Sequence, residues 1–212
     1  MPSTTPAPTD PAVVRRRREV ALAGHLGDAD TARRALVDPA PAVRATALGA
    51  MARLGQLTAS AWRSGLLDEA PEVRRRACEL GVGVGPGALG ELVERLADTD
   101  ASVTEAASFA LGELGADASP AVAALAGVAG GHDDPLAREA AVAALGAIGD
   151  PGGLPAILAA TTDKPAVRRR AVLALAPFDG PEVDAALARA LEDRDWQVRQ
   201  AAEDLSGGPA GT

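Results

Sequence analysis

Apolar residues recur along the chain in a spacing that predicts amphipathic helices. Six segments share one pattern: an acidic residue, an apolar anchor five or so positions later, and further apolar or small residues four, seven, eight and eleven positions after the anchor. At about 100° per residue these positions fall on one stripe, the buried face of a helix. The clearest set is Val103, Ala107, Ala110, Leu111 and Leu114.

The anchors repeat with a nearly constant period. They are Val43, Val73, Val103, Ala137, Val167 and Val198, spaced by 30, 30, 34, 30 and 31 residues. A period of this length marks stacked helical hairpins. We therefore expect an all-α solenoid of six hairpins in one domain over residues 11–206, with a flexible C-terminal tail at 207–212 and a disordered N-terminal tail at 1–10. In each hairpin a first helix (A) precedes the acidic residue, and a second helix (B) carries the anchor.

Proline and aspartate mark where the B helices begin. The residues Pro41, Pro71, Pro135 and Pro165 stand where the first helical residue belongs, and Asp100 and Asp195 where an N-cap belongs. The A helices are expected over residues 29–37, 57–67, 87–97, 119–129, 153–162 and 181–191. Residues 11–26 are predicted to form an additional, unpaired B helix that caps the N-terminal end.

Composition narrows the function classes. Hydrophobic residues make up 47% of the chain and aromatic residues 2%, so the core must be built from small aliphatic side chains. The net charge of −8 provides no global attraction to nucleic acids or anionic membranes. A single cysteine, Cys78, excludes an intrachain disulfide and is expected to be a packed thiol. With no apolar stretch long enough to span a bilayer and no signal peptide, the chain is expected in the cytoplasm.

The recurring string Asp–x–x–Pro–x–Val–Arg–x–x–Ala, followed by Ala–Leu–Gly, resembles HEAT repeats, most of all the type first described in phycobilisome lyases. The resemblance covers about residues 11–206. Relatives of this repeat include scaffolds, bilin lyase subunits, deoxyhypusine hydroxylases and alkylpurine DNA glycosylases. The hydroxylases bind iron through repeated His–Glu pairs, whereas His25 and His132 are followed here by Leu26 and Asp133. The glycosylases carry an aromatic cleft, whereas Trp62 and Trp196 lie on distant repeats.

An arginine directly follows most anchors, and an aspartate lies five or six residues before that arginine. In HEAT-like repeats such residues are known to form a ladder that links neighbouring hairpins, and the resemblance implies the same role here. Thr104 interrupts the arginine series. The expected ladder residues are Asp38, Arg44, Asp68, Arg74, Asp133, Arg138, Asp163, Arg168, Asp193 and Arg199.

A second row, two positions after each anchor, is expected to face outward. It reads Arg17, Ala45, Arg75, Glu105, Glu139, Arg169 and Gln200, so its charge changes from basic to acidic and back to basic. A nucleic-acid interface would show a continuous basic stripe, so the row favours a protein partner. The expected partner-binding residues are Arg17, Arg75, Arg76, Glu105, Glu139, Arg169, Arg170 and Trp196; for Trp196 a role as a cap of the C-terminal end is an equal alternative.

The first functional hypothesis is a monomeric, non-enzymatic scaffold that binds a protein partner along the concave face of its B helices. No catalytic residue, metal ligand or cofactor is expected. The residues around His132 converge poorly for a metal ion, and the longer fourth unit that contains them has no assigned role. Two alternatives stay open: a nucleic-acid-binding or DNA-repair-associated protein that uses its arginine clusters, and a lyase-like accessory subunit.

Overall fold

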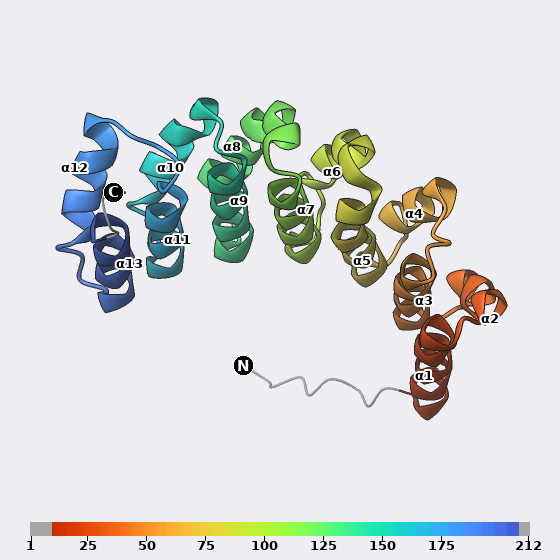
Figure 1. Cartoon of the computed structure of the whole chain (residues 1–212). Helices are drawn as coiled ribbons and strands as arrows, with labels where there is room; N and C mark the ends of the chain where they lie inside the picture. The colour runs from red at the N-terminus through yellow and green to blue at the C-terminus, as the bar shows by residue number, and fades with distance from the viewer. Residues whose placement is uncertain (1–9, 208–212) are drawn as a thin grey trace. The chain divides into compact units, whose positions relative to one another are not determined.

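The computed structural model describes residues 10–207, and these residues contain helices and turns but no strand. Figure 1 shows a capping helix, α1 (Pro11–Leu26), and then, within each of two units, helices that alternate between an A and a B layer. The predicted all-α class is therefore confirmed for the described residues. The predicted tails lie outside the described residues, apart from Asp10 and Gly207.

The chain divides into two compact units, with the boundary between Gly83 and Val84. The first unit contains α1 and two hairpins. In this unit α1 and the B helices α3 and α5 pack side by side, so α1 lies in the B layer as predicted. The hairpins are α2 (Ala29–Arg34) with α3 (Pro41–Arg53), and α4 (Ala59–Leu66) with α5 (Pro71–Gly81).

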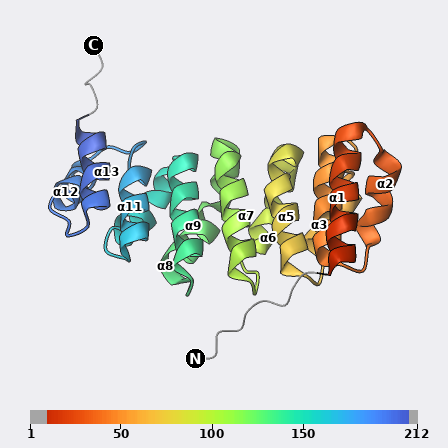
Figure 2. The same ribbon diagram turned by 90° about the horizontal axis from the view of Figure 1, so that it is seen from below.

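The second unit contains four hairpins. Its B helices α7, α9, α11 and α13 form one row in which each packs against the next (Figure 2). The hairpins are α6 (Leu89–Arg95) with α7 (Ala101–Glu113), α8 (Val122–Gly131) with α9 (Pro135–Ile148), α10 (Leu154–Ala160) with α11 (Pro165–Ala174), and α12 (Pro181–Ala190) with α13 (Trp196–Ser206).

The B helices begin where the sequence predicted. The four prolines occupy the first turns of α3, α5, α9 and α11, where the missing N–H has no helical partner to lose. The side chains of Asp100 and Asp195 accept hydrogen bonds from Ser102 N and Gln197 N, which caps α7 and α13. These local signals fix the start of each B helix to the residue.

Two A helices, α2 and α12, begin at the predicted residues, whereas the other four begin one to three residues later than predicted, because short polar or 3-10 segments precede them. The Thr58 side chain accepts a hydrogen bond from Ala61 N, so α4 starts at Ala59 instead of Leu57. A 3-10 segment over Gly115–Ala121 contains Pro120 and delays α8 to Val122. A second such segment, Val82–Ala88, delays α6 to Leu89. Proline lacks the N–H donor that an α-helix needs in its interior.

Small residues let neighbouring B helices approach closely. A Cβ atom added to Gly146 of α9 would lie 2.7 Å from both Cα and Cβ of Ala174 on α11. The same kind of contact joins Gly112 of α7 to Ala144 of α9, at 3.0 Å from its Cα. A core of alanine, valine and leucine follows from this spacing, and the buried anchors Val103 and Val167 belong to it. Trp62 is an exception: it is fully buried, and its Nε1 donates to the carbonyl oxygen of Ala77 at 2.8 Å.

Candidate functional site

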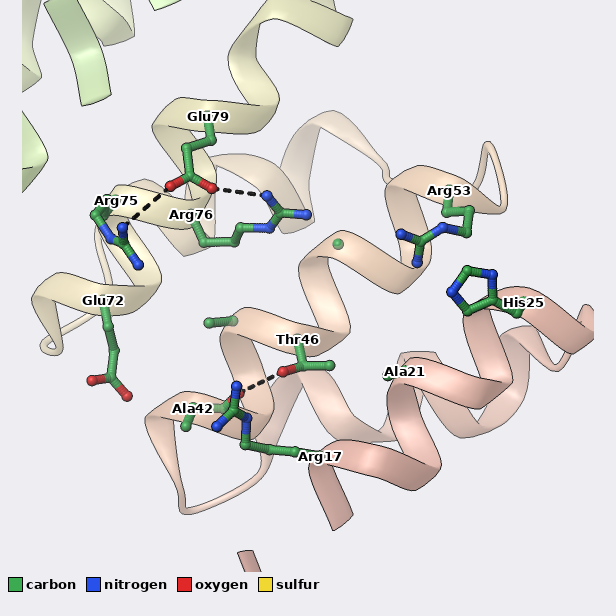
Figure 3. A pocket seen from close by; sticks show the side chains of 12 residues that line it. Arg17, Ala21, His25, Ala42, Thr46, Arg53, Glu72, Arg75, Arg76 and Glu79 are labelled. Atoms are coloured by element: carbon green, nitrogen blue, oxygen red, sulfur yellow. Dashed lines mark hydrogen bonds and ion pairs between the residues drawn. The ribbon is translucent and has the colours of Figure 1, made fainter. Parts of the chain in front are cut away.

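A groove of about 540 Å³ opens on the B-layer side of the first unit. Its floor is α3, whose side chains there are small: Ala42, Ala45, Thr46 and Gly49. Its walls are α1 and α5 (Figure 3). The groove exists because α3 presents alanine and glycine where α1 and α5 present arginine, histidine and glutamate. The wall and end residues are Arg17, Ala21, His25, Arg53, Glu72, Arg75, Arg76 and Glu79.

Two arginines of the groove are already engaged with one carboxylate. Arg76 Nη1 lies 2.8 Å from Glu79 Oε2, and Arg75 Nη1 lies 3.6 Å from Glu79 Oε1. All three residues are on α5. The Arg76 guanidinium reaches across Gly49 of α3, where an added Cβ would lie 2.6 Å from its Nη2. The Gly49 position therefore has to stay small for Arg76 to keep this place.

Two further arginines of the groove have no partner among residues 10–207. Neither the Arg17 nor the Arg53 guanidinium makes a hydrogen bond or ion pair with a residue in that range, and both side chains are exposed. Arg53 extends from the end of α3 toward α1, with its Nη1 3.5 Å from the place of a Cβ on Gly24, next to His25 (Figure 3). Arg17 was predicted as a partner-binding residue. Arg53 was not, because it lies ten positions after its anchor, outside the rows that the sequence singled out.

The outward-facing residues predicted for the second unit form a surface that differs from the groove of the first unit. Glu139 of α9 lies 3.9 Å from Arg169 and 3.5 Å from Arg170, both on the next B helix, α11. Two arginines of α11 thus share one carboxylate of α9. Glu105 is exposed, and one helical turn further along α7 Phe109 is 59% exposed. The corresponding side chain of α11, Leu173, is 36% exposed. Sequence reasoning missed these two apolar residues, although they stand four positions after the row that it did identify.

Trp196, the last predicted partner residue, is the first residue of α13. Its side chain is 64% exposed. Both readings of it, a partner anchor and a cap, stay predictions.

The ladder pairs lie between successive hairpins. Arg44 binds Asp68 in a bidentate contact, with Nε–Oδ2 at 2.8 Å and Nη2–Oδ1 at 2.7 Å. Arg138 binds Asp163 in the same way at 2.7 and 2.8 Å, and Arg168 binds Asp193 at 2.8 and 2.7 Å. Arg74 and Arg199 donate to main-chain oxygens at the start of their own helices: Asp68 O and Glu69 O for Arg74, and Asp193 O for Arg199.

The first rung uses an arginine that the sequence analysis did not choose. Arg16 of α1 binds Asp38 with Nε–Oδ2 at 2.8 Å and Nη2–Oδ1 at 3.1 Å. A signal for it existed: aligning Arg17 with Arg75 in the outward row places Arg16 level with Arg74. The capping helix therefore joins the ladder in the same way as α3, α9 and α11 do.

The assignment of Asp133 to the ladder was wrong by one residue. In four other units the ladder aspartate accepts a hydrogen bond from the N–H two residues later, as Asp193 does from Asp195. In the fourth unit His132 fills this position, because its Nδ1 accepts from Asp134 N at 3.0 Å. Arg138 contacts Asp133 only through its carbonyl oxygen. The N-cap Asp134 stays in register with Asp100 and Asp195, so His132 occupies the place that an aspartate holds in those units.

The rung that contains His132 also lacks an arginine at its other end. Thr104 follows the anchor Val103, where other B helices carry the ladder arginine, and it is fully buried. Its Oγ1 has no hydrogen-bond partner among the described residues. One rung of the ladder thus has neutral residues at both ends, Thr104 on α7 and His132 before α9.

Ion pairing lowers the pKa of the ladder carboxylates. Hydrogen bonds from Arg16, Arg138 and Arg168 are the main reason why the pKa values of Asp38, Asp163 and Asp193 lie below the ordinary range. For Asp68, burial is the largest effect and raises the pKa, but hydrogen bonds from Arg44 and Ala70 N outweigh it. The same pairs raise the pKa values of Arg44, Arg138 and Arg168. None of these carboxylates lines the groove.

Between residues 10 and 207, no three side chains of histidine, cysteine, aspartate or glutamate gather as a metal site would require. No helix in that range has the length and apolar character needed to cross a membrane. Cys78 is buried in α5.

Solved structures share the fold of this chain. YibA of Escherichia coli is 18% identical, with a TM-score of 0.68 over 88% of this chain and 72% of YibA. A designed armadillo repeat protein in complex with the peptide (KR)4 is 16% identical, with a TM-score of 0.52 over 94% and 95% of the two chains. Human deoxyhypusine hydroxylase is 22% identical, with a TM-score of 0.49 over 94% and 80%.

Sequence comparisons place the repeats in a family. A search of curated protein sequences found no significant match. The family model for HEAT repeats matches residues 89–165 and 129–206, which together are more than half of the chain. The predicted resemblance to HEAT repeats is thereby confirmed, and the chain belongs to the HEAT-repeat family.

Proposed function

We propose that this chain is a non-enzymatic scaffold that binds a protein partner on the exposed face of its B helices. The observation that carries the proposal is the groove formed by α1, α3 and α5. It is lined by charged groups that are exposed and incompletely paired, which is the character of a recognition surface. The predictions of a monomer that acts in the cytoplasm without a cofactor belong to the same proposal.

The electrostatics of the molecule support binding over catalysis. Catalytic acids and bases owe their shifted pKa values to a cleft environment. Here the carboxylates with a lowered pKa are the ladder aspartates and Asp28, which caps α2 through a hydrogen bond from Thr31. They serve the fold and lie away from the groove. The designed armadillo protein, which holds a peptide on a comparable fold, supports the same mode of binding.

A variant that fills the groove tests the proposal. Ala45 is on the groove floor, and Ala45→Trp places a large ring there. Ala123→Trp is the matched control, because Ala123 is exposed on the A helix α8 of the other unit. Tagged wild type and both variants are used to purify partners from the native host, with identification by mass spectrometry. Circular dichroism and thermal unfolding establish that each variant is folded.

We expect a protein partner to be recovered with the wild type and with Ala123→Trp, and to be lost with Ala45→Trp. Equal recovery with all three chains would show that the groove is not the binding surface. If no protein is enriched over the tag alone, the scaffold proposal itself is overturned.

A further inference from the structure

We infer that the groove of the first unit recognises an acidic peptide segment, whose carboxylates bind Arg17, Arg53, Arg75 and Arg76. The inference rests on the proposed function and specifies the chemistry of the partner. Four guanidinium groups line the groove, against the two carboxylates of Glu72 and Glu79. The groove is therefore locally cationic in a chain whose net charge is −8.

The arginines are arranged so that carboxylates can reach them. Arg17 and Arg53 stand unpaired toward opposite ends of the groove, within the range of residues 10–207 (Figure 3). Arg75 and Arg76 share Glu79, at 3.6 and 2.8 Å, so each keeps donors that Glu79 does not occupy. A guanidinium presents five N–H donors in a planar fork that matches a carboxylate. One acidic segment lying over α3 would thus meet donors from both walls.

The floor of the groove leaves room for a main chain. Ala42, Ala45 and Gly49 of α3 project little beyond the helix backbone, whereas the arginines of α1 and α5 rise on either side. An added Cβ at Gly49 would collide with Arg76, so glycine there keeps both the depth of the groove and the position of the guanidinium. A peptide is thin enough to lie on such a floor while its side chains reach the walls.

The lining favours carboxylates of a peptide over phosphates of a nucleic acid. Glu72 and Glu79 would repel a continuous phosphate backbone, while a peptide can place neutral residues opposite them. No phenylalanine, tyrosine or tryptophan lines the groove, and the single imidazole of His25 provides no row of rings on which successive bases could stack. In the second unit, the corresponding residues Glu105 and Glu139 do not continue a basic stripe.

The test measures binding of three probes to the full chain, each with four charged groups. Fluorescence anisotropy at low salt measures binding of a labelled (GE)4 peptide, a labelled (GK)4 peptide and a labelled pentathymidylate, which carries four phosphates. The variant Arg17→Glu/Arg53→Glu removes the two unpaired guanidiniums. Its control, Arg189→Glu/Arg194→Glu, makes the same change of net charge at exposed residues of the second unit.

We expect (GE)4 to bind the wild type. Its affinity for Arg17→Glu/Arg53→Glu should be lower by a factor of about ten or more. The control variant should stay within about twofold of the wild type, because screening weakens the effect of distant charges. The (GK)4 peptide should not bind. Rising salt should weaken the (GE)4 complex in the wild type more than any residual binding in the groove variant.

Three results would overturn the inference: no binding of (GE)4, equal binding by the groove variant and the wild type, or tighter binding of pentathymidylate than of (GE)4. These results are distinct from failure of the proposed function. If (GE)4 does not bind but Ala45→Trp still loses a protein partner, the groove binds a partner of other chemistry, and only the present inference fails.

Discussion

Arg168 and Asp193 form a bidentate ion pair that joins α11 to the hairpin that follows it. The two contacts are 2.8 and 2.7 Å long, and the side chains are only 7% and 15% exposed. Arg168 Nη1 also donates to the carbonyl oxygen of Asp163 at 2.9 Å, so one guanidinium holds the starts of two successive B helices. Because water is largely excluded, removal of one partner leaves the other charge buried and uncompensated, which costs more than breaking an exposed ion pair does.

Asp193→Asn should destabilise the protein by about 1–3 kcal/mol, because it leaves the buried guanidinium of Arg168 without its charged partner. Asparagine keeps Oδ1, and with it the hydrogen bond from Asp195 N, so the loss reports on the ion pair. Urea unfolding measures the change. Asp133→Asn is the control: Asp133 is exposed, and the change should stay within about 0.5 kcal/mol. Similar losses for the two variants would mean that the pair adds nothing specific.

Acid should weaken the ladder only below the pH range in which ordinary carboxylates become protonated. The pKa of Asp193 is lowered in the folded chain, mainly by the hydrogen bond from Arg168. Its contribution is therefore complete above the unfolded pKa of about 3.9, and is lost as the pH falls through the lower, folded value. The difference in unfolding free energy between wild type and Asp193→Asn should be constant from pH 7 to about pH 5 and shrink below about pH 4. A difference that grows on acidification would contradict this assignment.

The sequence predicted those parts of the structure that local chemistry decides. Proline and aspartate set the starts of the B helices, and the spacing of arginine and aspartate matched three of the inter-hairpin pairs. Register failed where the chain departs from its period. Before α9, His132 and not Asp133 lies level with the ladder, and the unpaired helix α1 obscured the role of Arg16.

The groove was beyond the sequence analysis for a different reason. Its depth depends on the contrast between small residues on α3, such as Ala45 and Gly49, and arginines on both neighbouring helices. The row of residues two positions after each anchor contains only some of the residues that form this contrast. Arg53 joins the site because its side chain extends back toward α1, and the direction of a long side chain does not follow from spacing.

The neutral rung at Thr104 and His132 should accept an ion pair. Thr104→Arg alone places a charge at a buried position with no carboxylate in register, and should destabilise the protein. His132→Asp alone should change stability by no more than about 0.5 kcal/mol, because Oδ1 can replace Nδ1 as the acceptor for Asp134 N. In the double variant the two changes should couple favourably by about 1–3 kcal/mol in a double-mutant cycle. Zero coupling would show that positions 104 and 132 do not form a rung.

Two glycine substitutions should change stability in opposite directions. Gly146→Ala brings a Cβ to 2.7 Å from Ala174 on the adjacent helix, so α9 and α11 must separate, at a cost of about 1–3 kcal/mol. Gly127 is an exposed residue of α8 with no atom within 4 Å of an added Cβ. Gly127→Ala should stabilise the protein by about 0.5–1 kcal/mol through helix propensity. Thermal unfolding compares the two, and a stabilising Gly146→Ala would contradict the close approach of these helices.

The two tryptophans give each unit its own fluorescent reporter. Trp62 in the first unit is fully buried, and Trp196 in the second is 64% exposed. Trp196→Phe should therefore leave blue-shifted emission that acrylamide quenches poorly, whereas Trp62→Phe should leave red-shifted emission that is readily quenched. The reverse order would contradict the burial of Trp62 and its hydrogen bond to Ala77.

The Trp196→Phe variant also tests whether residues 11–206 form one domain, as the repeat period predicts. In urea, Trp62 emission follows the first unit, while far-ultraviolet circular dichroism follows the helices of both units. Neighbouring repeats stabilise one another through their interfaces, so a single array should unfold with one midpoint by both measurements. If Trp62 becomes exposed at a urea concentration where most of the helical signal persists, the two units unfold separately, and the prediction of a single domain is wrong.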